Sequence, residues 1–181
     1  MSISQLNKQV VDQIAAGEVV ERPSHLVKEL IENSIDAGAT KVEVRFDNGG
    51  RDIFVKDNGH GISESDMAMA LDRHSTSKIC NYEDIWDLSS YGFRGEALAS
   101  ISAVSDFELI SRTKDSPTAY TIKSRFGERT NVSATQAPVG TQIRVSRLFE
   151  NTPVRIKFLK SPGYEHSLIK QVIKALALIN Y

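Results

Sequence analysis

The segment Leu26–Ile35 constrains the fold most, because its apolar residues recur at the spacing of one helical face. That face consists of Leu26, Val27, Leu30, Ile31 and Ile35. The opposite stripe carries three acids and an amide, namely Glu29, Glu32, Asn33 and Asp36. If this stripe lines a cleft, Asn33 offers an oxygen ligand to Mg²⁺ and Glu29 lies within reach of a water molecule. The alternative is an ordinary exposed helix face.

The composition excludes several classes of protein. The 181 residues suffice for one sizeable domain, and the net charge of −1 gives no overall attraction to nucleic acid or membrane. The single cysteine, Cys80, excludes an internal disulfide and a thiolate metal cluster. No segment approaches about 20 consecutive apolar residues, so we expect a soluble, intracellular protein with no membrane partner. The last helix lacks a stop signal before Tyr181, so we expect the native protein to continue.

A predicted hairpin leads to a second candidate site. Lys41–Phe46 alternates between polar and apolar residues, Asn48-Gly49-Gly50 is a turn signal, and Ile53–Val55 forms the returning strand. Asp57 therefore stands at a strand end, where its carboxylate suits an adenine exocyclic amine and disfavours a base with a carbonyl there. Gly61 would let the backbone approach the base. A tight turn after a strand is the alternative.

A third candidate is a glycine loop before a predicted helix over Gly95–Ile101. Gly92-Phe93-Arg94-Gly95 would aim backbone N–H groups at an anion. Ser75-Thr76-Ser77-Lys78 offers hydroxyls and a cation to a phosphate, and the Thr141 hydroxyl could lie beside Asp57. The chain has no Walker motif and no Gly-x-Gly-x-x-Gly after a strand, which argues against a P-loop NTPase or a dinucleotide enzyme. The three candidates together suggest an ATP site.

The order of predicted elements indicates the fold class. A helix ending near Gly17 precedes one from Pro23 to about Ala37, and a helix capped by Ser63 runs through Leu71. Short β-type runs then form a meander: Phe107–Ile110, Tyr120–Ile122, Asn131–Ser133 and Thr141–Val145. Helices follow from Pro153 and from about Glu165. We expect one domain over residues 1–181, an α/β (α+β) two-layer sandwich whose mostly antiparallel, mixed sheet carries helices on one face.

One local run of positive charge lies late in the chain. It comprises Arg144, Arg147, Arg155, Lys157 and Lys160, against Glu150 alone. A solvated face is one interpretation. The other is a weak, non-specific contact with DNA phosphates, whose affinity would fall steeply with salt.

The joint pattern is more specific than its parts. The chain resembles the GHKL ATPases, which include gyrase B-type topoisomerases, Hsp90 chaperones and sensor histidine kinases. The resemblance rests on the order of four motifs: Glu-x-x-x-Asn on a helix, then Asp-x-Gly-x-Gly, a glycine loop and Gly-Thr. Within that superfamily, residues 14–23, 28–40 and 92–101 resemble the MutL family of DNA mismatch repair ATPases, and the similarity covers the whole chain. Val154 and Ile156 depart from the family's Asn-Thr-Pro-Ala-Arg-Arg-Lys-Phe-Leu, which puts one basic contact in doubt.

The resemblance implies a GHKL (Bergerat) ATP-binding fold and a role for each motif. Glu29 would be the general base, Asn33 the Mg²⁺ ligand, and Asp57 the reader of adenine beside Gly61 and Thr141. The other residues expected to contact ATP are Ala37, Thr76, Ser77, Lys78, Gly92, Phe93, Arg94, Gly95, Glu96, Ala97 and Leu98. The family's lysine-bearing second subdomain and its C-terminal dimerisation domain would lie outside this chain, as would any endonuclease site.

The resemblance also implies a slow, Mg²⁺-dependent ATPase that acts as a conformational and dimerisation switch. Its expected partners are a MutS-type mismatch recognition protein, DNA and a second copy of the full-length protein, in the cytoplasm and at the nucleoid during repair. A gyrase-, Hsp90- or kinase-type ATPase is a rival, and residues 92–101 argue against it. A DNA-binding scaffold with a degenerate nucleotide site is another, which the intact Glu29 and Asn33 disfavour.

Overall fold

The computed structural model describes residues 11, 14, 16, 17, 19–73, 75, 91 and 95–180. Its strands are β1 (Val42–Asp47), β2 (Asp52–Asp57), β3 (Asp106–Arg112), β4 (Ala119–Arg125), β5 (Glu128–Arg129), β6 (Ser133–Thr135) and β7 (Gly140–Ser146). Its helices are α2 (Pro23–Asp36), α3 (Glu64–Met67), α4 (Ala97–Ala103), α5 (Pro153–Phe158) and α6 (Pro162–Ile179). Two short 3₁₀ helices, η1 (Asn48–Gly50) and η2 (Met69–Leu71), complete the described elements.

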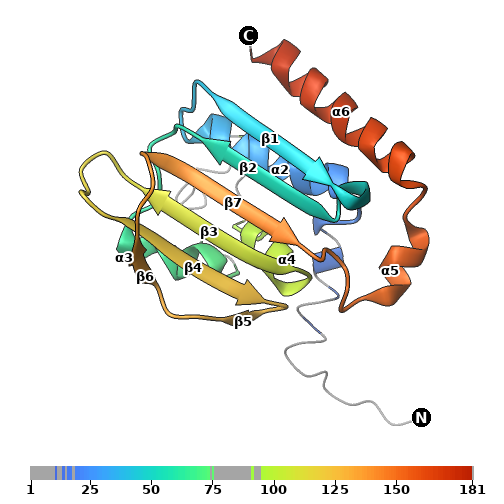
Figure 1. The fold of residues 1–181 in the computed structure, drawn as a ribbon, viewed down its shortest axis with the longest axis horizontal. Helices are drawn as coiled ribbons and strands as arrows, with labels where there is room; N and C mark the ends of the chain where they lie inside the picture. Colours follow the sequence, from blue (N-terminus) through green and yellow to red (C-terminus); the bar gives the residue numbers. More distant parts are fainter. Residues whose placement is uncertain are drawn as a thin grey trace, which may run out of the picture.

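The strands form one sheet with α2, α3 and α4 on a single face, which confirms the two-layer sandwich (Figure 1). The expectation of a mixed sheet is wrong for the described strands, whose pairings are all antiparallel. The expected meander is also wrong, because β7 inserts between β2 and β3. Ile143 and Val145 explain this order, since both are buried and a central strand covers them best.

The core lies between α2 and the inner face of the sheet. Leu26, Val27, Leu30 and Ile31 of α2 belong to one buried cluster with residues of β2, β3 and β7. Pro23 begins α2 and Gly38, with a φ of +69°, follows its end, as the sequence predicts. The predicted polar stripe is wrong for Glu32, which is buried and forms an ion pair with Lys28 at 2.8 Å.

In the first half of the chain, several helices begin or end at residues other than those that the sequence predicts. The first helix extends past Gly17 to Val19, because the Val20 N–H donates to the Ala16 carbonyl and both side chains are buried. The helix after Ser63 stops at Met67 and continues as η2. Gly95 lies outside α4, because its φ of +61° is not helical.

The second half shows similar shifts. The run at Asn131–Ser133 is displaced to β6, and the two-residue strand β5 is too short to leave a hydrophobic pattern. The last helix begins at Pro162 rather than near Glu165, because the Ser161 side chain caps it by accepting from the Tyr164 N–H. None of the described helices combines the length and the hydropathy that crossing a membrane requires.

The basic run at residues 144–160 does not form one surface. Arg147 donates to Asp106 at 2.9 Å and is hydrogen-bonded to Glu150, which holds the pKa of the Glu150 carboxyl below its usual value. Arg155 turns toward the core, where its guanidinium lies 5.6 Å from the centre of the Phe149 ring. Burial lowers the pKa of Arg155. The predicted solvated face, or DNA contact, therefore cannot involve all members of this run.

An ion pair between the half-buried Arg22 and the buried Glu165 joins α2 to α6, which lies beside it near the β1 edge of the sheet (Figure 1). Glu165 is 1% exposed, and its Oε1 accepts from Arg22 at 2.7 Å and from the Lys160 N–H at 2.8 Å. Arg22 is the residue directly before α2. The pair thus fixes where α2 begins relative to α6.

We expect Arg22→Ala to lower the free energy of unfolding by about 3 kcal/mol, because it leaves the Glu165 charge buried without its cation. Glu165→Gln should cost less, since the amide oxygen still accepts from the Lys160 N–H. Urea unfolding measures both. The exposed Arg125→Ala should change stability by less than about 0.5 kcal/mol. A loss for Arg22→Ala as small as that of Arg125→Ala would contradict the structural role of the pair.

Candidate functional site

The polar side of α2 places two of the predicted residues at the edge of the core. Glu29 and Asn33 are both half-buried, one helical turn apart, beside the fully buried Leu30. Half-burial suits groups that must meet a ligand and yet keep a fixed position. The structure therefore keeps the predicted pairing of a carboxylate and an amide on one face of α2.

The Asp57 carboxylate lies where α2, β2 and β7 meet, and it is only 8% exposed. Its Oδ1 accepts from the Gly59 N–H at 2.9 Å and from the Thr141 N–H at 3.1 Å. Its Oδ2 lies 3.1 Å from the Ser34 hydroxyl, whose one proton can go to this charged oxygen or to the Leu30 carbonyl at 3.0 Å, and the charged acceptor is the stronger of the two. An ionised carboxylate offers about four acceptor positions, so one position on Oδ2 remains for an N–H of a ligand.

Thr141 lies beside Asp57, as predicted, and Ser111 orients its hydroxyl. The Ser111 hydroxyl donates to the Gly140 carbonyl at 2.9 Å and accepts from the Ile62 N–H at 2.8 Å. Ser111 has one hydroxyl proton, so in this arrangement Thr141 donates across the 3.0 Å that separates the two oxygens. The Thr141 oxygen then keeps its acceptor capacity for a ligand or a water molecule.

Ser34 and Ser111 belong to this network and were not predicted from the sequence. The position of Ser34 could have been noticed in the sequence, because it continues the apolar stripe of α2 four residues after Leu30. A hydroxyl buried at such a position needs a hydrogen-bond partner. The sequence signal for Ser111 is weaker: it is a polar residue at one of the alternating, buried positions of β3. Both are small hydroxyl residues, which fix a neighbouring group without filling the space in front of it.

Two glycines allow the backbone to close around Asp57. Gly61 has a φ of +77°, and a Cβ there would clash with the Arg112 carbonyl. Gly140 has a φ of +114°, and a Cβ there would clash with the carbonyl of Asp57 itself. The steric need for glycine at residue 61 comes from the Arg112 backbone, so the predicted approach to a base stays a prediction; the need for glycine at residue 140 was not foreseen.

Ala37 meets the turn that follows Asp57. Its carbonyl accepts from the His60 N–H at 3.0 Å, and a Cβ on Gly59 would lie 2.8 Å from the Ala37 Cβ. The end of α2 and the Asp57 turn are therefore in direct contact. The structure brings together Ala37, Asp57, Gly61 and Thr141, four of the predicted contact residues.

The glycine loop is only partly described. A Cβ on Gly95 would clash with the Ser75 backbone, so the segments that hold the two predicted phosphate contacts meet there. Glu96 precedes α4, and the half-buried Ala97 and Leu98 form its first turn. The remaining predicted contacts lie outside the described residues: Thr76, Ser77, Lys78, Gly92, Phe93 and Arg94.

The oxygen donors that α2 offers suit Mg²⁺ only if a bound ligand supplies further oxygen atoms to the same ion. No group of three or more His, Cys, Asp or Glu side chains able to hold a metal occurs among the described residues. Mg²⁺ commonly keeps several waters and takes one or two protein oxygens together with phosphates. The Asn33 amide oxygen, with the Glu29 carboxylate one turn away, suits that shared arrangement.

Comparisons with known proteins agree with this geometry. Residues 21–151 match the family model for histidine kinase-, DNA gyrase B-, and HSP90-like ATPases. DNA mismatch repair protein MutL of Baumannia cicadellinicola is 46% identical over the whole chain, and MutL of Neisseria meningitidis is 50% identical over 97% of it. The chain spans only 30% and 27% of these relatives' lengths.

Solved structures give the same result. The Aquifex aeolicus MutL ATPase domain complexed with ADP superposes with a TM-score of 0.68 at 39% identity, over 90% of this chain and 57% of that one. The N-terminal domain of a DNA repair protein superposes with a TM-score of 0.70 at 35% identity, over 97% and 50%. By its sequence and its fold, the chain belongs to the histidine kinase-, DNA gyrase B- and HSP90-like ATPase family, as a MutL-type mismatch repair ATPase domain.

Proposed function

We propose that this domain binds ATP with Mg²⁺, hydrolyses it slowly, and acts in a longer protein as a nucleotide-driven switch that couples mismatch recognition to later repair steps. The observation that carries the proposal is the buried Asp57 carboxylate, which keeps one acceptor position beside the Thr141 hydroxyl. An exocyclic amine satisfies that position, whereas a carbonyl would place two acceptors together. The site thus favours adenine over guanine.

The residues of α2 supply the chemistry in this proposal. Asn33 holds Mg²⁺ together with the phosphates, and a bound Mg²⁺ would offset charge on the phosphate oxygens. Glu29 orients a water molecule for in-line attack on the γ-phosphate and takes its proton. Thr76, Ser77, Lys78 and residues 92–98 wrap the phosphates. Ordering of these segments by nucleotide would be the switch.

The proposed partners follow from the longer relatives. We expect the full-length protein to act with a MutS-type mismatch recognition protein, to associate through this domain with a second copy when ATP is bound, and to bind DNA weakly and without sequence preference. Any nuclease activity would reside outside these 181 residues.

We expect Glu29→Ala to leave ATP affinity within about twofold of wild type and to lower turnover at least about a hundredfold, the usual contribution of a general base. Phosphate release under single-turnover conditions measures this. Glu21→Ala, an exposed carboxylate just before α2, is the matched control and should hydrolyse ATP normally. Unchanged hydrolysis by Glu29→Ala would refute the role of Glu29.

We expect Asp57→Asn to weaken ATP binding about ten- to a hundredfold, because one acceptor oxygen becomes a donor that opposes the adenine amine. Fluorescence competition with a labelled ATP analogue measures the loss. Asp115→Asn changes an exposed carboxylate in the same way and should bind like wild type. Equal affinity in both variants would remove Asp57 from adenine recognition.

We expect Asn33 to make ATP binding depend on Mg²⁺. Wild-type affinity for a non-hydrolysable ATP analogue should rise when Mg²⁺ is added, and in Asn33→Ala this gain should largely disappear, because the amide oxygen is one of few protein ligands available. Titrations with Mg²⁺ and with a chelator give the ratio directly. A wild-type affinity that does not depend on Mg²⁺ would count against the assignment.

A further inference from the structure

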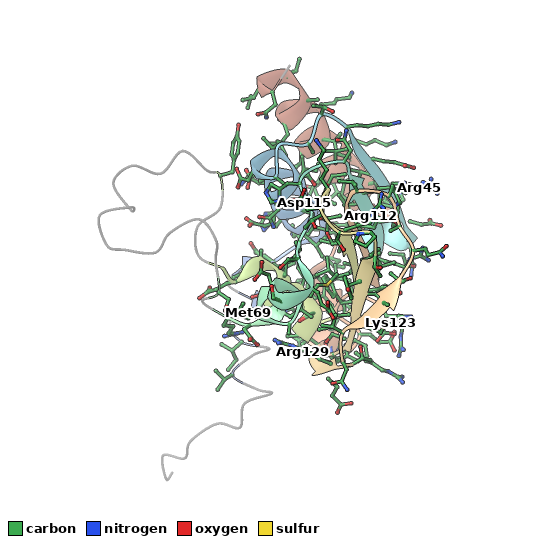
Figure 2. The ribbon with its side chains drawn as sticks, turned by 90° about the vertical axis from the view of Figure 1, so that its left-hand side faces the viewer. Arg45, Met69, Arg112, Asp115, Lys123 and Arg129 are labelled. Atoms are coloured by element: carbon green, nitrogen blue, oxygen red, sulfur yellow. The ribbon has the colours of Figure 1, made fainter. Side chains whose placement is uncertain are left out.

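Ser111 is buried near the end of β3, a strand that holds none of the residues predicted to contact the nucleotide. Side chains alternate along the strand, and Ser111 shares the inner face with the fully buried Leu109. The outer face is the helix-free side of the sheet, from which Lys123 extends opposite Glu108 (Figure 2). The Ser111 side chain therefore lies on the same side of the sheet as α2 and the buried Asp57 carboxylate.

Three hydrogen bonds use the whole capacity of the Ser111 hydroxyl. Its oxygen accepts from the Ile62 N–H at 2.8 Å, and its proton goes to the Gly140 carbonyl at 2.9 Å, which can only accept. The remaining lone pair faces the Thr141 hydroxyl at 3.0 Å, so Thr141 donates there. Ser111 is 0% exposed and keeps no position for a ligand. Any effect of Ser111 on nucleotide binding must therefore pass through these three neighbours.

One of these contacts leads directly to Asp57. The Gly140 carbonyl and the Thr141 N–H belong to the same planar peptide group. Ser111 donates to the carbonyl end of this group, and the N–H end donates to the Asp57 Oδ1 at 3.1 Å. Gly140 has a φ of +114°, and a glycine backbone has the greatest freedom to turn. Ser111 thus restrains the peptide group that orients the Asp57 carboxylate.

A second buried serine, at the end of α4, offers a contrast. Ser105 is also 0% exposed, and its hydroxyl donates to the Ile101 carbonyl at 2.7 Å, four residues earlier in the chain. Such a bond satisfies a buried hydroxyl within its own segment. Ser111 instead reaches two other segments, the turn at Ile62 and the start of β7, and both lie beside Asp57. A serine that only fills space in the core does not need such contacts.

We propose that Ser111 is a positioning residue for base selection. It keeps the Thr141 hydroxyl turned so that the Thr141 oxygen can accept from a ligand, and it holds the Gly140–Thr141 peptide so that Asp57 keeps its free acceptor in place. Both effects shape one wall of acceptors, which favours a base that carries an exocyclic amine. The assignment rests on the proposed ATP site, and it adds a residue that acts only through its neighbours.

The test compares ATP with purine riboside triphosphate, which carries hydrogen in place of the exocyclic amine. Calorimetric titration of the 181-residue chain with Mg²⁺ gives both dissociation constants, and their ratio isolates the contribution of the amine. We expect a wild-type ratio of about ten or more, the usual loss for a hydrogen bond to a charged group. The ratio should fall about fivefold in Ser111→Ala and in Ser111→Cys, which fills the same space with a thiol that donates and accepts weakly.

Two further variants separate the positioning role from a loss of core packing. Ser111→Thr keeps the hydroxyl and should keep the ratio within about twofold of wild type. Ser105→Ala removes a buried hydroxyl away from the site and is the matched control, with an expected wild-type ratio. Urea unfolding of the same samples reports the stability that each substitution costs. A lowered ratio in Ser111→Cys, with wild-type ratios in Ser111→Thr and Ser105→Ala, supports the assignment.

The contrary outcomes are distinguishable from failure of the ATP site itself. A wild type that prefers ATP, together with an unchanged ratio in Ser111→Cys, would overturn the role of Ser111 and leave the ATP site standing. An equal loss in Ser105→Ala or in Ser111→Thr would also overturn it, because the Ser111 hydroxyl would then not be the cause. A wild-type chain that binds neither nucleotide would refute the ATPase proposal, and the role of Ser111 with it.

Discussion

The Asp57 carboxylate is the interaction on which the rest of the site depends. Its two oxygens join the Ser34 hydroxyl of α2, the Gly59 turn after β2 and the Thr141 N–H of β7. These groups come from segments that are far apart in the chain, and a buried carboxylate is tolerated only where such donors converge. The same contacts that satisfy its charge also set the position of α2, and with it Glu29 and Asn33, relative to the base that Asp57 would read.

Local elements could be predicted from the sequence, and long-range pairing could not. The periodicity of α2, the alternation of β1 and the glycine turn are local signals, so they located Glu29, Asn33 and Asp57 correctly within their elements. The insertion of β7 between β2 and β3 depends on which apolar strand fills the centre of the sheet, a choice that short strand patterns leave open. Thr141 could be offered from the sequence as a neighbour of Asp57, and the family resemblance supported it, while Ser34 and Ser111, whose roles exist only after packing, were missed.

Runs of charge in the sequence were the least reliable predictor of which side chains share a surface. The run from Arg144 to Lys160 is basic in sequence, yet Arg147 is neutralised by acids and Arg155 packs on Phe149. Register across three strands, β1, β2 and β7, brings Arg144 together with Arg45, which lies far earlier in the chain, around Phe54. The acids Glu43 and Glu108 pair with cations on the same surface, Glu43 with Arg45 and Glu108 with Lys123.

The central claim is that a buried carboxylate with one free acceptor position selects adenine. The most direct test is calorimetric titration of the wild-type chain with ATP and with inosine triphosphate, which differ at the exocyclic position of the base, both with Mg²⁺ present. The account predicts that inosine triphosphate binds at least about tenfold more weakly, because its carbonyl opposes the Asp57 oxygen. Equal affinity for the two nucleotides would contradict the account, since the base would then be held without Asp57 reading its amine.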